Sequence, residues 1–220
     1  MQADSSAEAI PLLVIIFAIG LLPFFAMMVT SYTKIVVVLG LVRNALGVQQ
    51  VPPNMVLNGI AIIVSVYIVA PLFMDSFDAL QRPSTGATGG GSAQVFKVLE
   101  TAREPVRRFL DKHAHAREKA FFLKSVASIW TPERAKLVRA DDLIILAPAF
   151  TLSELTEAFK IGFLIYLAFI VVDLIVANIL LALGLSQVTP TQIAIPFKML
   201  LFVVMDGWSV LIHGLVMTYR

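Results

Sequence analysis

The stretch from Ser31 to Asn54, SYTKIVVVLGLVRNALGVQQVPPN, decides how this chain is organised. It joins two long apolar segments, holds the cations Lys34 and Arg43, and closes with Pro52-Pro53-Asn54. Short connections that carry Lys and Arg without acids face the cytoplasm in most membrane proteins. We therefore interpret residues 34–53 as a cytoplasmic connection between two membrane helices.

Four apolar segments are long enough to cross a membrane, which takes about 20 mostly apolar residues. Residues 9–33 and 44–74 hold no charged side chain, residues 161–183 hold only Asp173, and residues 191–219 hold Lys198, Asp206 and His213. The chain is 58% hydrophobic, with a mean hydropathy of +0.86, which is too apolar for a soluble domain. We predict an all-α integral membrane protein with four long apolar helices in two hairpins.

The polarity pattern divides the chain into three expected regions. Residues 1–74 would hold membrane helices one and two, with helix two beginning after Pro52-Pro53 and ending near Pro71. Residues 75–157 would form a polar helical insert with a flexible linker at 81–94, and residues 158–220 a C-terminal membrane hairpin. The charge rule then places both termini and the insert in the periplasm.

Local signals predict the helices of the insert and the hairpin. Residues 95–119 are typical of an amphipathic helix bent at Pro105, and Thr131-Pro132 is typical of a helix start. Thr151-Leu152-Ser153-Glu154 matches a capping box, which predicts that the third membrane helix begins there. The turn of residues 184–190 would join it to the fourth.

Five charged residues are candidates for buried charges that specify assembly: Lys34, Arg43, Asp173, Lys198 and Asp206. A central Asp costs about 3 kcal/mol on the insertion scale, and each large apolar residue returns about 0.3–0.6 kcal/mol, so residues 161–183 would still insert. Lys198 is too far from Asp206 to pair on one helix, so its partner should lie on another helix or subunit. We favour this structural interpretation over a polar path, although a stand-alone ion or solute transporter is an alternative.

No feature of the sequence supports catalysis or a cofactor. The chain has no cysteine, and His113 and His115 do not share a helix face, which argues against a metal site. Ser31-x-x-Lys34 matches the start of a serine–lysine acylase motif, but the companion motifs are missing, so a membrane enzyme is the weakest hypothesis. A net charge of +2 without a basic tract gives no reason to expect nucleic acid.

Three ordered blocks of the sequence resemble the SctR/FliP family, which includes the YscR/HrcR-type export-gate proteins of bacterial type III secretion systems. The blocks are Thr33-Lys34 with IVVVLGLVRNALG and Pro52-Pro53-Asn54; Leu146-Ala147-Pro148-Ala149-Phe150, Leu152-Ser153-Glu154-Leu155 and Ala158-Phe159-Lys160-Ile161-Gly162-Phe163; and Ala182-Leu183-Gly184, Pro190, Ile195-Pro196-Phe197-Lys198, Leu201-Phe202-Val203 and Asp206-Gly207-Trp208. The stretches at 47–50 and 212–215 are more similar to the virulence injectisome branch than to the flagellar one.

The resemblance implies a multi-pass protein of the bacterial inner membrane whose assembled complex extends toward the periplasm. It implies a homo-pentamer that acts with SctS/FliQ-type, SctT/FliR-type, SctU/FlhB-type and SctV/FlhA-type proteins and conducts unfolded effector proteins. Many relatives carry a methionine triplet at the pore constriction, where this chain has Leu185, Ser186 and Gln187. We expect the position of the constriction to carry over, without the flexible methionine seal.

Overall fold

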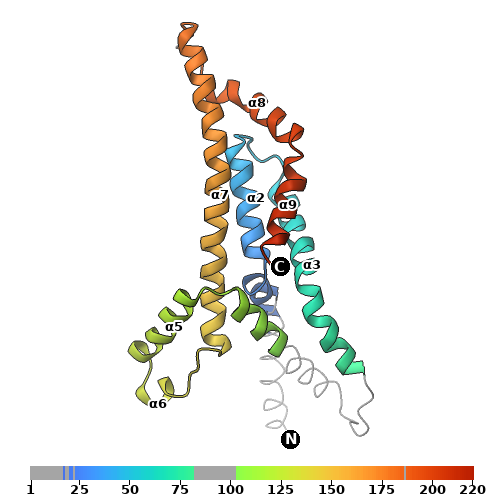
Figure 1. Ribbon diagram of the computed structural model, residues 1–220, viewed down its shortest axis with the longest axis vertical. Coiled ribbons are helices and arrows are strands. Elements are labelled where there is room, and N and C mark those ends of the chain that lie inside the picture. The colour runs from blue at the N-terminus through green and yellow to red at the C-terminus, as the bar shows by residue number, and fades with distance from the viewer. Residues whose placement is uncertain (1–16, 18–19, 22, 82–102, 186) are drawn as a thin grey trace, which may run out of the picture.

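The computed structural model describes the chain outside residues 1–16, 18–19, 22, 82–102 and 186. Within that part every regular element is a helix. The labelled helices are α2 (Tyr32–Ala45), α3 (Asn54–Gln81), α5 (Ala116–Ile129), α6 (Pro132–Ala135), α7 (Leu143–Ala182), α8 (Pro190–Val204) and α9 (Gly207–Met217). Residues 23–28 and 103–113 are also helical. Helix α7 is the long axis of the molecule, and α2, α5 and α8 pack against it (Figure 1).

Two described helices are long and apolar enough to cross a membrane, α3 over Asn54–Leu72 and α7 over its whole length. Helices α8 and α9 pass the same test only as a pair, and they meet at a bend of 62°. The all-helical class is therefore confirmed for the described residues, with two or three membrane-capable elements. The fourth expected span, residues 191–219, is a broken pair and not one straight helix.

Helix α2 corrects the expectation that residues 34–53 form a connection. Its inward positions repeat with helical spacing and are buried: Lys34, Ile35, Val38, Leu39, Val42 and Ala45. The β-branched run Ile35-Val36-Val37-Val38 disfavours a helix by up to about 0.7 kcal/mol per residue. Full burial of each large aliphatic side chain stabilises by about 1.5–3 kcal/mol, so packing against α3 and α7 outweighs the local preference.

Several expected helix boundaries are also wrong. The first helix ends at residue 28, before a turn at residues 29–31. Helix α3 begins after Pro52-Pro53 as expected but continues through Pro71. Helix α7 begins at Leu143, with Pro148 inside it, so the predicted capping box at 151–154 lies within the helix. The predicted helix over 95–119 is interrupted at residues 114–115, and its first part lies outside the described residues.

The predicted helix start at Thr131-Pro132 agrees with the structure. Thr131 and Pro132 start α6 as predicted, with Thr131 at the N-cap. Gly184 ends α7 in a left-handed conformation with φ of 74°. Its amide donates to Leu181 O, and the Leu185 amide donates to Leu180 O, which is the Schellman pattern of a helix end. The chain then turns back into α8, which packs against α7 (Figure 1).

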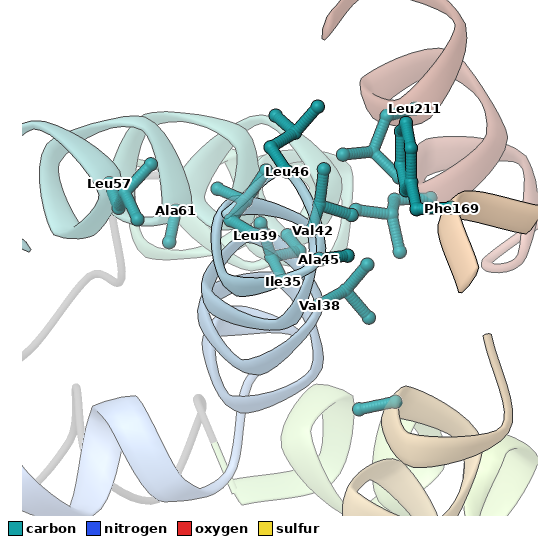
Figure 2. Close-up of a cluster of buried hydrophobic side chains, with 12 residues drawn as sticks. Ile35, Val38, Leu39, Val42, Ala45, Leu46, Leu57, Ala61, Phe169 and Leu211 are labelled. Atoms are coloured by element: carbon teal, nitrogen blue, oxygen red, sulfur yellow. The ribbon is translucent and has the colours of Figure 1, made fainter. Parts of the chain in front are cut away.

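Three apolar clusters hold the described helices together, and the smallest joins α7 to α8. The largest is centred on α2, and Figure 2 shows Leu57 and Ala61 of α3 on one side of it and Phe169 and Leu211 on the other. The second joins the helix of residues 103–113 to the start of α7 and includes Phe109, Leu110, Ala149, Phe150 and Tyr219. The insert therefore packs on the body of the molecule at the N-terminal end of α7.

Helices α2 and α7 come very close at Gly162. A Cβ atom placed there would lie 2.3 Å from Leu41 Cδ1 and 3.0 Å from Leu41 Cβ. Glycine is therefore the residue that permits this approach, because any larger side chain would collide with α2.

Candidate functional site

A buried ion pair joins α2 to α7 in the middle of the fold. Lys34 Nζ lies 2.9 Å from Glu154 Oε1, and the two residues are only 4% and 2% exposed. The Tyr219 hydroxyl donates a hydrogen bond to Glu154 Oε2. The ring of Tyr219 lies 4.2 Å from Lys34 Nζ, which places the ammonium over an aromatic face.

The insert is attached at the same place. Its residue His115 donates its backbone N–H to Ser153 Oγ at 2.9 Å, and that hydroxyl donates to Ala149 O at 2.7 Å. Tyr219 stacks on Phe109 with 6.1 Å between ring centroids. The edge of His113 meets Tyr219 at 5.1 Å. Side chains from α2, the insert, α7 and the C-terminal residues therefore meet around one carboxylate.

His113 reports the electrostatic environment beside this cluster. Burial, followed by the positive charges of Lys112 and Lys34, lowers the pKa of His113 from 6.5 to about 4. The imidazole is therefore neutral at pH 7, and the surroundings of the ring are net positive.

A second ion pair joins α7 to α8, between a buried lysine and a partly exposed aspartate. Lys198 Nζ lies 2.6 Å from Asp173 Oδ2, and it also donates to Ala45 O at the end of α2, at 3.1 Å. Lys198 is 3% exposed. Its expected partner on another helix is therefore found. The other carboxylate oxygen, Asp173 Oδ1, is buried and accepts no hydrogen bond from the residues that the structure describes.

The remaining predicted charges are placed differently. Arg43 is half-buried and donates to Pro52 O at 3.2 Å and Asn54 Oδ1 at 2.6 Å, which closes the turn before α3. Asp206 is exposed and stands before α9 with a left-handed backbone, at φ of 50°. It belongs to none of the ion pairs found in the described part of the chain.

The predicted constriction lies at the turn after α7. Leu185 and Gln187 are exposed there, and Ser186 lies outside the described residues. The end of a long helix therefore presents these positions away from the core (Figure 1). Within the described residues, no group of three or more His, Asp or Glu side chains is arranged to hold a metal ion.

The sequence analysis missed Glu154 and Tyr219 as partners of Lys34. The available signal was the helical spacing of Lys34 with Val38 and Val42, which places the lysine on the buried face of a helix. A buried lysine needs a counter-charge. Glu154 was the first acid after Pro148, and its match to a capping box concealed that role.

Long apolar helices joined by ion pairs define the chain as an α-helical membrane protein. The FliP family matches residues 15–215, and the chain belongs to this family. This result confirms the resemblance carried by the three sequence blocks.

The sequences of named relatives align with this chain over nearly their whole length. The chain is 64% identical to the hypersensitivity response secretion protein HrcR of Ralstonia nicotianae, over 98% of this chain and 99% of the relative. It is 48% identical to Yop proteins translocation protein R of Yersinia pestis, over 96% and 97%. It is 38% identical to virulence protein YscR of Salmonella typhimurium, over 93% and 94%. These names describe secretion and translocation rather than catalysis, which agrees with the prediction that the chain is not an enzyme.

Proposed function

We propose that this protein is a structural and conducting subunit of a type III secretion export gate. It would form the entrance pore through which unfolded effector proteins cross the bacterial inner membrane. The observation that carries the proposal is the match of almost the entire chain to HrcR, a secretion protein, at 64% identity.

In this proposal the chain acts as a homo-pentamer with SctS/FliQ-type and SctT/FliR-type subunits, next to SctU/FlhB-type and SctV/FlhA-type proteins. Its four apolar segments would form two hairpins, with the insert of residues 75–157 on the periplasmic side. Exposed apolar side chains along α7 support an assembly, among them Leu164, Leu167, Leu174 and Ile179. Contiguous apolar surface of this kind is covered by protein or lipid in the working state.

The ion pairs weigh against a stand-alone transporter. Asp173 and Lys198 pair with each other, and Lys34 pairs with Glu154, so four of the charges in the apolar region are neutralised inside one chain. A transport path needs charges that are free to exchange partners with the solute or ion. We therefore propose that these ion pairs stabilise the packing of the helices and do not form a transport path.

Deleting the gene in a bacterium with a type III system tests the role directly. We expect secreted effectors to disappear from the culture medium and to return when the intact gene is supplied. Native mass spectrometry of the purified protein, with and without the two small partner proteins, should show a discrete pentamer that gains partners. Normal secretion after deletion, or a monomer that ignores the partners, would overturn the proposal.

The constriction can be tested with a photo-crosslinking amino acid. Placed at Leu185 during export of a stalled substrate, it should capture that substrate. The matched control is Leu137, which is also apolar and is 79% exposed but belongs to the insert. Equal capture at both positions would contradict the proposal that residues 185–187 form the pore constriction.

A further inference from the structure

A cavity of about 440 Å³ lies between residues 68–72 of α3, the helix of residues 103–113 and Tyr219. Its size is in the range of small-molecule sites. One wall is apolar and includes Ile68, Leu72 and Phe109, whereas Arg108 and Lys112 line the other side. The cavity therefore combines an apolar wall with a cationic one.

Arg108 and Lys112 are both exposed, and Arg108 forms one long ion pair, with Glu104. Arg108 and Lys112 are four residues apart on one helix, so they share a face. Glu104 binds the neighbouring Arg107 through two hydrogen bonds of 2.9 Å, and its distance to Arg108 is 3.7 Å. Lys112 forms none of the ion pairs found among the described residues. His113 also lines the cavity, and after burial the positive charges of Lys112 and Lys34 contribute to its low pKa.

The cavity also has a defined place relative to the apolar surface of the protein. The uncharged apolar segment of residues 44–74 ends two residues after Leu72, so Ile68 and Leu72 lie close to the end of that segment. Arg108 and Lys112 lie on the insert and line the same cavity. In a membrane protein this is the level at which hydrocarbon gives way to headgroups, where basic pockets recruit anionic lipids.

We infer that this cavity binds an anionic phospholipid. The phosphodiester would lie between Arg108 and Lys112, and the start of an acyl chain would lie against Ile68, Leu72 and Phe109. The apolar wall favours a lipid over a soluble anion, and among the lining residues that the structure describes two cations without an acid favour an anionic headgroup over a zwitterionic one. The inference relies on the membrane location in the proposed function but not on pore formation.

Native mass spectrometry of the detergent-purified protein tests this inference. Phosphatidylglycerol and phosphatidylcholine with the same acyl chains are titrated separately. We expect phosphatidylglycerol to be retained preferentially, and the double variant Arg108→Gln/Lys112→Gln to lower its affinity by about 5-fold per cation removed. The control Arg117→Gln/Lys124→Gln removes the same charge from α5, outside the cavity, and should keep wild-type affinity.

Three results would overturn the inference. They are equal retention of the two lipids, an equal loss of affinity in both double variants, and displacement of the lipid by millimolar inorganic phosphate. Both variants change exposed side chains, so an unchanged thermal unfolding midpoint without lipid serves as the folding check. Because the purified protein is measured without a secretion assay, this result is independent of the test of the proposed function.

Discussion

The side chain of Lys34 places an ammonium group on the buried face of α2, where the other inward side chains are aliphatic. Removing such an ion from water costs several kcal/mol. Three groups offset that cost, namely the Glu154 carboxylate, the Tyr219 ring and, through the carboxylate, the Tyr219 hydroxyl. Each group comes from a different part of the chain than Lys34, so the pair forms only when α2, α7 and the C-terminal residues are together.

The variant Glu154→Gln keeps the shape of the side chain and removes its charge. We expect it to lower the free energy of unfolding by about 3–5 kcal/mol, because Lys34 stays buried without a counter-charge. Denaturation of the detergent-purified protein, followed by circular dichroism, measures this change. Glu133→Gln on α6, which is exposed, should stay within about 0.5 kcal/mol of wild type.

The double variant Lys34→Met/Glu154→Leu sharpens the same prediction. It replaces both charges by apolar side chains of similar size, so it should regain most of the stability that Glu154→Gln loses. A double variant as unstable as the single one would contradict the explanation by an unpaired charge.

His113 predicts how stability depends on pH. The unfolded chain binds the imidazole proton with a pKa of 6.5, whereas the folded chain binds it only near pH 4. Between these values the unfolded state holds more protons, so stability is lost as the pH falls from about 6.5 toward 4. We expect His113→Phe to flatten this part of the pH profile of unfolding midpoints. His115→Phe, a substitution at the neighbouring histidine, should leave the profile sloping as in wild type.

At the scale of single helices, local sequence signals predicted some elements and misplaced others. Pro52-Pro53 correctly marked the start of α3, and Gly184 correctly marked the end of α7. The start of α7 was misplaced because a capping box is a pattern of four residues, while the helix is set by apolar contacts upstream. Ile145, Leu146, Ala149 and Phe150 are all buried, which offsets the roughly 3 kcal/mol that an internal Pro148 costs.

Helix α2 was missed for a related reason. Lys34 and Arg43 look like the flanks of a loop when only the neighbouring residues are considered. Their roles depend on Glu154 and Asn54, and Glu154 is distant in the sequence. The sequence therefore identified which cations matter, whereas the partner of Lys34 and the helix that carries both cations required the three-dimensional arrangement.

The break between α8 and α9 depends on the backbone of Asp206. A left-handed conformation costs alanine about 1 kcal/mol more than it costs Asp, Asn or Gly. We expect Asp206→Ala to lower stability by about that amount, and Asp206→Asn and Asp206→Gly to stay near wild type in thermal unfolding. If Asn and Gly are as harmful as Ala, the charge is what matters, as the assembly hypothesis of the sequence analysis proposes.

At the scale of the whole molecule, a large share of the apolar surface is exposed in the single chain. Leu164, Leu167, Val171 and Leu174 follow one another at intervals of three and four residues and are 47–66% exposed. They therefore form a stripe along one face of α7. A stripe of this length is covered by protein or lipid in the working state, and we propose that a neighbouring subunit covers it.

Polar substitutions on this stripe test that role. Leu167→Asn/Leu174→Asn should convert the oligomer to monomers in native mass spectrometry, because each unpaired amide in a packed interface costs about 1–3 kcal/mol. Helical content of the monomer should be unchanged, since neither side chain is in the core. Leu137→Asn on the insert should leave the oligomer intact. An oligomer that survives the stripe variant would mean that lipid, not protein, covers α7.

The length of α7 has a consequence for how its residues respond to substitution. Its 40 residues, at 1.5 Å each, make a rod of about 60 Å. The hydrocarbon layer of a bilayer is only about 30 Å thick. A membrane-spanning α7 would therefore extend about half of its length beyond the hydrocarbon layer. One continuous helix would then contact lipid over one part and water or protein over the other. The tolerance of a position on α7 to a polar residue should change along the rod, even where exposure in the isolated chain is the same.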